Sequence, residues 1–453
     1  MRILLVAPMF PPQRGVAPLR THSFAAKWAA AGHAVTVLTT KKRADQVGLT
    51  VPATGFQVVE IPSRGPWPLE VLRRLSRYRA PAGGPVAADT GASLKDRLLM
   101  PLRYLKGRTG VFSSVRQPDL TDRWIEPALG WAQAHGPWDV VVTSGGPPAA
   151  HLVALGIRGR GRCRLWAADF RDLWSDNHIY TGLFPWTLLE RHRERRVLAN
   201  VDRLVTVSPG LATRLAAKAG KPVEVIYNGY DPADFAGLPP EPIFPADGRV
   251  RLVYTGTVYD RGQDLRALCA AVAAEPAATL VVASDRADLW HAAARRAGLG
   301  ERLDFRGSVP RADALRMQRD ASVLVLLDWY DPRHGVLTGK VFEYLLSPAP
   351  IWVVGGARDS PAARLVAEAG RGVALGRDVA RIRTAIRDLA AGRGPRLVPN
   401  REFIAGLARD VQARRFLRLL EGDAAKPVPG GGEVVAEGLA EPLAESRYNR
   451  KCL

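Results

Sequence analysis

The sequence predicts an α/β protein made of two Rossmann-like, doubly wound parallel-sheet domains that face a common cleft. Two observations carry this prediction: near-continuous apolar runs alternate with segments of helical period, and the scheme occurs twice, on either side of a proline-rich stretch. Strands that are buried on both faces read as continuous apolar runs, so the pattern indicates parallel sheets covered by helices. A chain of 453 residues is also long for one core, which favours two domains.

Seven apolar runs in the first half and six in the second are expected to be strands. They are residues 3–7, 34–39, 56–61, 139–143, 164–168, 203–207 and 223–227, then 251–254, 279–283, 302–305, 322–327, 351–354 and 372–375. Segments of helical period lie between them, for example 21–31 and 209–219. In such sheets, ligands bind beyond the carboxyl ends of the strands.

The domain division follows from composition. Residues 236–249 hold four prolines and show no periodicity, as a linker does. We therefore expect an N-terminal, acceptor-side domain at 1–235 with a basic insertion at 64–123, the linker at 236–249, a C-terminal domain at 250–400, a helix at 401–421 that packs back on the first domain, and a tail at 422–453. The tail is rich in Gly, Pro, Ala and Glu, a composition typical of disorder.

The overall composition limits the classes of protein. A hydrophobic content of 47% with 24% charged residues is typical of a soluble globular protein, and 64 Lys and Arg against 44 Asp and Glu give a net charge of +20. That charge indicates either a polyanionic partner or a surface on which arginine is the default residue. Cys163, Cys269 and Cys452 are too widely spaced for a disulfide framework or a zinc site. The chain has no apolar run long enough for a signal peptide or a membrane span, so we expect a cytoplasmic protein.

The insertion at 64–123 interrupts the alternation. It holds ten Arg and two Lys against five acidic residues, and apolar side chains lie among them. Basic residues mixed with apolar ones suit the surface of an anionic bilayer. The other interpretation is an inserted pair of helices whose arginines face solvent.

Two stretches of the first domain predict parts of a site. The first strand is followed by a turn at Gly15 and a helix, whose free N–H groups attract phosphate or carboxylate. The fifth strand runs into "LWAADFRDLWSDN". Where this parallel strand ends at the cleft, the polar residues Asp169, Arg171, Asp172 and Asp176 cluster with Trp166 and Trp174. Carboxylates there could bind hydroxyl groups or accept a proton. An internal Arg–Asp network that holds a loop is the alternative.

Two stretches of the second domain predict the rest. In "VYTGTVYDRG", Gly256 and Arg261 lie at a strand-to-helix turn, where an arginine can pair with a diphosphate. In "HGVLTGKVFEY", Thr338 is the expected N-cap of a helix that presents Lys340 and Glu343 on one face. A lysine at a helix N-terminus is electrostatically unfavourable unless an anion lies there. Glu343 is then placed to accept hydrogen bonds from hydroxyls such as those of a ribose.

The chain resembles the GT-B fold glycosyltransferases, close to the family-4 retaining enzymes of bacterial polysaccharide biosynthesis. The resemblance lies in "RILLVAPMFPPQRG", "AAKWAAAGHAVTVLTT", "VDRLVTVSPGLATRL", "VIYNGYDPADF", "VYTGTVYDRG" and "GKVFEYLLSPAPIWVVGG", which span most of residues 1–421 in family order. It implies two Rossmann-like domains, with a nucleotide-sugar donor held mainly by the C-terminal domain and the acceptor by the N-terminal domain.

By position, the resemblance implies that Arg261 and Lys340 neutralise the donor diphosphate and that Glu343 binds the ribose. The remaining donor contacts would come from Gly15, Gly256, Gly335, Val336, Leu337 and Thr338, and no metal and no cofactor is expected. Candidate catalytic residues are thus Arg261, Lys340 and Asp169, with Arg171, Asp172 and Trp174 on the acceptor side. The chain also departs from the family, since the first of its two paired acids falls on Gly335 and its usual arginine on Thr257.

The predicted function is transfer of a sugar from a nucleotide-diphosphate sugar to a lipid-linked or glycan acceptor, in cell-surface polysaccharide or glycolipid biosynthesis. An anionic membrane surface is a further candidate partner, which would make the protein peripheral on the inner face of the cell membrane. One alternative is a nucleotide-sugar 2-epimerase of GT-B fold. The other is a basic nucleic-acid-binding protein, for which the sequence offers no motif. The missing GxGxxG motif argues against a dehydrogenase.

Overall fold

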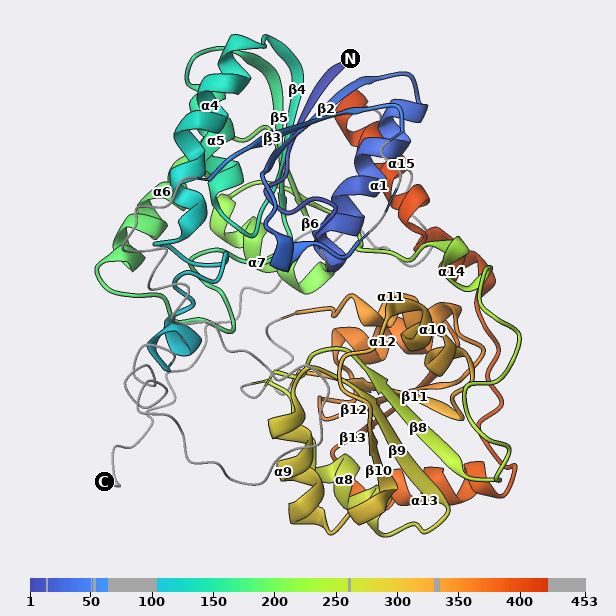
Figure 1. Ribbon diagram of the computed structural model, residues 1–453. Coiled ribbons are helices and arrows are strands. Elements are labelled where there is room, and N and C mark those ends of the chain that lie inside the picture. Colours follow the sequence, from blue (N-terminus) through green and yellow to red (C-terminus); the bar gives the residue numbers. More distant parts are fainter. Residues whose placement is uncertain are drawn as a thin grey trace, which may run out of the picture.

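The computed structural model describes residues 1–13, 15–49, 51, 54–63, 104–259, 262–329 and 335–422, which fold around two parallel sheets (Figure 1). The first sheet has the strand order β3-β2-β1-β4-β5-β6-β7, and the second has the order β10-β9-β8-β11-β12-β13. The second order is that of a doubly wound nucleotide-binding sheet, and the first adds one strand at its edge. The predicted fold class is confirmed.

All thirteen predicted strands form, with ends that shift by one or two residues. They are β1 Arg2–Val6, β2 Ala34–Thr40, β3 Gln57–Ile61, β4 Trp138–Ser144, β5 Cys163–Phe170, β6 Arg203–Thr206, β7 Val223–Val225, β8 Val250–Thr255, β9 Ala278–Ala283, β10 Leu303–Phe305, β11 Val323–Leu327, β12 Ile351–Val354 and β13 Gly372–Gly376. In the central strand β4, Val140, Val141 and Val142 are all fully buried. Both faces of the sheet are thus covered, as the unbroken apolar run predicts.

The helices lie on both faces of each sheet (Figure 1). Their bounds are α1 Val16–Ala30, α4 Ile125–Ala134, α5 Ala149–Arg158, α6 Trp186–Asn200, α7 Pro209–Ala219, α8 Arg266–Ala273, α9 Ala287–Ala297, α10 Arg311–Arg319, α11 Lys340–Leu346, α12 Pro361–Glu368, α13 Val379–Ala390, α14 Arg401–Gly406 and α15 Arg409–Glu421. Short 3₁₀ turns occur at Ala44–Gln46, Leu120–Trp124, Pro232–Phe235 and Gly300–Arg302. In the described ranges, no helix is both long and apolar enough to cross a membrane.

The C-terminal helix α15 packs on the first domain. Phe416 contacts the stacked rings of Phe24 and Trp28 edge-on, at centroid distances of 5.3 and 5.4 Å, and the Trp28 indole donates to the carbonyl of Ala413 at 2.9 Å. The segment predicted as one helix is split into α14 and α15, because the N–H of Arg409 donates instead to the carbonyl of Tyr230 at 2.8 Å. The two segments in which the chain passes between the domains, near Tyr230 and near Arg409, are therefore hydrogen-bonded to each other.

The proline-rich segment 236–249 contains no helix or strand. Its apolar residues nevertheless pack on the second domain, since Phe244 is buried in that core and the N–H of Ile243 donates to the Asp320 carboxylate at 2.8 Å. Most of the predicted basic insertion (64–103) and nearly all of the predicted tail (423–453) lie outside the described residues.

Candidate active site

The loops that follow the carboxyl ends of both sheets meet, and glycines form the contact. Gly335, at a φ of +66°, lies so close to Gly210 at the start of α7 that a Cβ on either residue would come within 2.5 Å of the other Cα. The Ser208 hydroxyl, which caps α7, donates to the Gly335 carbonyl at 2.6 Å. A residue with a longer side chain at position 335 would therefore require the two loops to move apart.

The segment after Gly335 runs from one helix N-terminus of the first domain to another. A Cβ on Gly339 would lie 2.9 Å from a methyl group of Val16, the first residue of α1. Gly15, at a φ of +127°, is the N-cap of α1. Residues 335–339 therefore lie between the N-termini of α7 and α1. The structure thus brings the predicted donor-binding glycines Gly15 and Gly335 onto one junction.

Other parts of this segment differ from expectation. Leu337 is buried in the core of the second domain, so its side chain does not face the junction, whereas Val336 and Thr338 are half-buried. Thr338 is not the N-cap of α11: that position is Gly339, without a side-chain cap. In the first turn of α11, the N–H groups of Val341 and Phe342 donate to the backbone carbonyls of Thr338 and Gly339 at 3.2 and 3.3 Å.

Lys340 is the first residue of α11 and extends back toward β8. Its ammonium donates to the Tyr254 hydroxyl at 2.5 Å and to the Thr257 carbonyl at 3.4 Å, and it lies 4.0 Å from the centroid of the Tyr254 ring. Gly256, at a φ of +112°, makes room, since a Cβ there would lie 3.1 Å from Nζ. Burial lowers the pKa of Lys340 to about 7, although the charges of Glu343 and Asp285 favour the ammonium.

Glu343 lies one turn along the same helix and is held by an arginine. Arg311, at the start of α10, donates to Glu343 Oε1 at 2.7 Å and to Asp234 at 2.7 Å. Sequence analysis missed Arg311, because its position just after a Ser-Val-Pro turn carries no motif. The described hydrogen bonds of Glu343 use Oε1 only.

Asp169, predicted as catalytic, has a structural role in this fold. Its side chain is fully buried and accepts both Nε and Nη2 of Arg20, at 3.0 and 2.9 Å, as well as the Ser144 hydroxyl at 3.0 Å. Arg20 also donates to the carbonyl of Tyr227 at 2.7 Å. This is the internal Arg–Asp pair that the sequence left open as the alternative, and it ties the ends of β4 and β5 to α1.

Among the predicted acceptor-side residues, Arg171 and Trp174 serve the structure of the loop, whereas Asp172 is accessible to solvent. Arg171 donates to the carbonyls of Gly145 and Gly146, both at 2.8 Å, and so holds the loop after β4. Trp174 is buried, so its ring is not an open platform for a sugar. Asp172 is reached by solvent at a pocket that Gly145, Gly146 and Trp174 also line. Desolvation by the neighbouring protein, with a smaller contribution from the charge of Asp169, raises the pKa of Asp172 to about 6, against the charge of Arg171.

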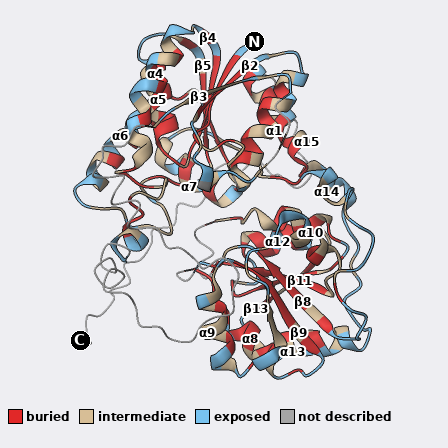
Figure 2. Ribbon diagram, in the orientation of Figure 1, coloured by how far each residue is buried: buried red, intermediate tan, exposed pale blue. Residues whose placement is uncertain are grey.

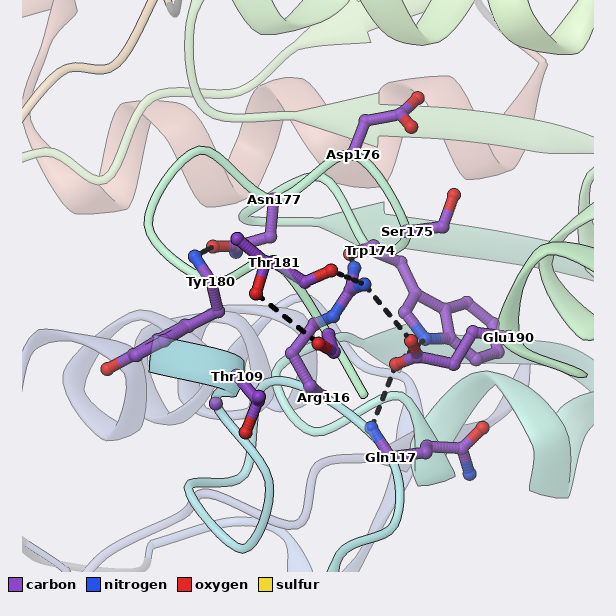
Figure 3. A network of polar contacts seen from close by, with 12 residues as sticks. Thr109, Arg116, Gln117, Trp174, Ser175, Asp176, Asn177, Tyr180, Thr181 and Glu190 are labelled. Carbon is purple, nitrogen blue, oxygen red and sulfur yellow. Dashed lines mark hydrogen bonds and ion pairs between the residues drawn. The ribbon is translucent and has the colours of Figure 1, made fainter. Parts of the chain in front are cut away.

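A buried polar network holds the loop that carries Asp172 and Trp174 (Figure 3). Arg116 donates to the carbonyls of Trp174 and Thr181 at 2.6 and 3.2 Å and pairs with Glu190 of α6 at 3.2 Å. The Trp174 indole donates to the same Glu190 carboxylate at 3.3 Å. Because Arg116 and Glu190 are at most 1% exposed, the loop that carries Asp172 has little freedom to shift.

Aromatic side chains also contact one another across the junction. Trp329, at the end of β11, packs edge-on against His178 of the first domain at 4.7 Å and stacks on Tyr259 at 5.4 Å. Trp329 is buried, and within the described ranges its indole N–H has no hydrogen-bond partner. Arg261, predicted to bind the diphosphate, lies next to this cluster in sequence but outside the described residues. The described residues hold no cluster of three or more potential metal ligands.

Comparison with known proteins agrees with this architecture. Residues 17–230 match the family model of a glycosyl transferase 4-like domain. Sucrose-phosphate synthase from Thermosynechococcus elongatus has a similar structure, with a TM-score of 0.62 and 16% identity over 93% of this chain and 98% of that one. The structure of Anabaena HepE, solved with UDP and glucose, gives a TM-score of 0.55 and 14% identity over 93% of this chain and 100% of that one.

The lipopolysaccharide outer core galactosyltransferase WaaB gives a TM-score of 0.51 and 12% identity over 93% of this chain and 99% of that one. At such low identities the structural neighbours establish only the fold of this chain. The activity, glycosyl transfer, is inferred from the match to the family model. No curated protein matches the chain by sequence. The chain is therefore a glycosyltransferase of the GT-B fold, and its residues 17–230 form a glycosyl transferase 4-like domain.

Proposed function

We propose that this glycosyltransferase takes its sugar from a nucleoside-diphosphate sugar bound at the junction of the two domains. The observation that carries the proposal is Lys340. Its described hydrogen-bond partners, Tyr254 and Thr257, are uncharged, and burial lowers its pKa to about 7. The charges of Glu343 and Asp285 favour the ammonium but do not offset its desolvation, and a diphosphate bound beside it would supply further negative charge.

The chemistry of transfer agrees with this position. Negative charge develops on the diphosphate as the glycosidic bond breaks, and a fixed cation stabilises it more in the transition state than in the ground state. We propose that Lys340, rather than a metal ion, neutralises the leaving group. The UDP and glucose in the HepE structure support a nucleoside diphosphate as the donor part.

Glu343 would bind the ribose through Oε2, while Arg311 fixes its other oxygen. Asp172 is the acceptor-side group that we propose to contact the incoming hydroxyl, because it is the candidate carboxylate that solvent reaches. The acceptor would be a lipid-linked or glycan molecule of cell-surface polysaccharide or glycolipid biosynthesis, and the protein would then work at the inner membrane surface.

Donor binding tests this proposal directly. Thermal unfolding is followed with UDP, GDP, ADP and CDP, since a bound ligand raises the midpoint by mass action. One nucleotide should stabilise the wild type and the Lys41→Met control, in which an exposed lysine is replaced, but not Lys340→Met. The absence of any shift, or an equal shift in Lys340→Met, would overturn the proposal. Products that contain an epimerised donor instead of a transferred sugar would favour the epimerase.

A further inference from the structure

Exposed apolar side chains gather on one surface of the first domain. Of the eight large hydrophobic residues that are exposed in the described ranges, five lie on two segments, 104–105 and 184–188. Phe184 is 75% exposed, Tyr104 63% and Leu188 54%. The other two are Leu105 and Trp186. Single exposed apolar residues need no explanation, but a group of this size does.

The two segments belong to one surface, although they are far apart in sequence. Residues 104–109 are helical, and the end of this helix is bonded to the loop that leads into α6. The N–H of Thr181 donates to the carbonyl of Arg108 at 3.2 Å, and the N–H of Gly182 donates to that of Thr109 at 3.1 Å. We call Tyr104–Arg108 together with the outer face of α6 and Phe184 the α6 surface.

The charged residues of α6 are sorted by face. Both of its carboxylates point inward and are fully buried: Glu190 pairs with Arg116 at 3.2 Å (Figure 3), and Glu194 pairs with Lys218 at 2.7 Å. Arg191, Arg195 and Arg196 are exposed instead, and α6 carries exposed residues at the edge of the first domain (Figure 2). The surface is therefore cationic as well as apolar.

We propose that the α6 surface docks on an anionic lipid bilayer. Tryptophan and tyrosine favour the membrane–water interface, where the ring is buried and its polar edge stays hydrated. Arginines beside them would lie at the level of anionic headgroups.

This inference deepens the proposed function. Membrane docking itself does not depend on the proposed function, whereas the link between docking and a lipid-linked acceptor does. The loop after β5 carries Asp172 and continues directly to Phe184 and α6. Docking through α6 would thus bring the acceptor side of the site to the membrane, where a lipid-linked acceptor resides. The buried pair Arg116–Glu190 couples the two, because it fixes the loop and orients α6 at once.

Vesicle co-sedimentation tests the proposal. The wild type should bind vesicles of phosphatidylcholine and phosphatidylglycerol more tightly than vesicles of phosphatidylcholine alone. Replacing Arg191, Arg195 and Arg196 by Gln should weaken binding on the order of a hundredfold, since each arginine near the surface contributes about a factor of five. The matched control replaces three exposed arginines elsewhere, Arg295, Arg296 and Arg401, by Gln and should change binding much less.

A conservative variant guards against misfolding. Trp186→Phe should fold normally, and the difference between its fluorescence and that of the wild type should show a tryptophan that brominated lipids quench. Equal vesicle binding by the Arg191/Arg195/Arg196 variant and its control, or no quenching of Trp186, would overturn the proposal. So would loss of a dimer on Phe184→Ser with unchanged vesicle binding, which would make the surface a contact with a second copy. Vesicle binding without any nucleotide binding would instead count against the proposed function alone.

Discussion

The Lys340→Met variant distinguishes between two roles of Lys340, binding of a ligand and stabilisation of the fold. Methionine keeps the length and much of the volume of the side chain but removes the charge. If Lys340 is held for a diphosphate, the empty protein bears the cost of its burial, and the variant should be more stable while losing nucleotide affinity. If Lys340 serves the fold through Tyr254, the variant should be less stable.

The magnitude follows from the pKa. Lys340 is charged in the unfolded chain up to a pH near 10.5, whereas in the folded chain its pKa is about 7. Each pH unit between these values corresponds to about 1.4 kcal/mol, so the cost has an upper bound of about 5 kcal/mol. Lys340 is only half-buried and keeps some contact with water. We therefore expect the variant to gain about 2 kcal/mol at pH 7.

The sign of the pH dependence is fixed by the lowered pKa. The full cost is present at and below about pH 7, where both states bind the proton, and it disappears as the pH rises toward 10.5. Urea unfolding of wild type and variant at several pH values measures this difference, with Lys41→Met as the control. A variant that is less stable at pH 7, or a gain that stays constant from pH 7 to 10, would refute the reasoning.

Gly210→Ala should keep the first domain stable but weaken donor binding, because its Cβ meets Gly335 of the other domain. The control Gly130→Ala, whose Cβ has nothing within 4 Å, should leave donor binding unchanged. Calorimetry with the nucleotide compares the affinities of the two variants. Glu343→Gln should weaken nucleoside diphosphate binding about tenfold, by loss of a hydrogen bond to a charged group, and unchanged affinity would make its pair with Arg311 purely structural. Asp172→Asn should abolish a rise of the acceptor KM below about pH 6, where the wild-type carboxylate becomes protonated; an unaltered pH profile would exclude contact with the acceptor.

The fold could be predicted because its determinants are local. An apolar run such as Val140–Val142 reports burial on both faces of a sheet without reference to the rest of the chain. Prediction failed where a distant backbone group competes with helix formation. Residues 402–421 have helical period throughout, yet the helix is interrupted because the N–H of Arg409 bonds to Tyr230, and nothing near position 409 indicates this.

The site was predictable to a smaller extent. Lys340 and Glu343 stand out because a lysine at a helix start conflicts with the helix dipole and so indicates an anion. For Asp169, the residue type and its place at a strand end fit both a catalytic and a structural role. The deciding partner, Arg20, is 149 residues away, and only the folded chain shows that it occupies both carboxylate oxygens.

The net charge illustrates the same point at the scale of the surface. A value of +20 is compatible with arginines spread evenly over a protein and with a concentrated patch. On α6, the partners of its two glutamates show that the second case applies. Arg116 and Lys218 draw Glu190 and Glu194 into the interior, and a helix with four arginines and two glutamates consequently exposes positive charge almost alone. Because the same Glu190 also accepts from Trp174 in the loop that carries Asp172, the residues that hold this loop also determine which face of α6 is cationic.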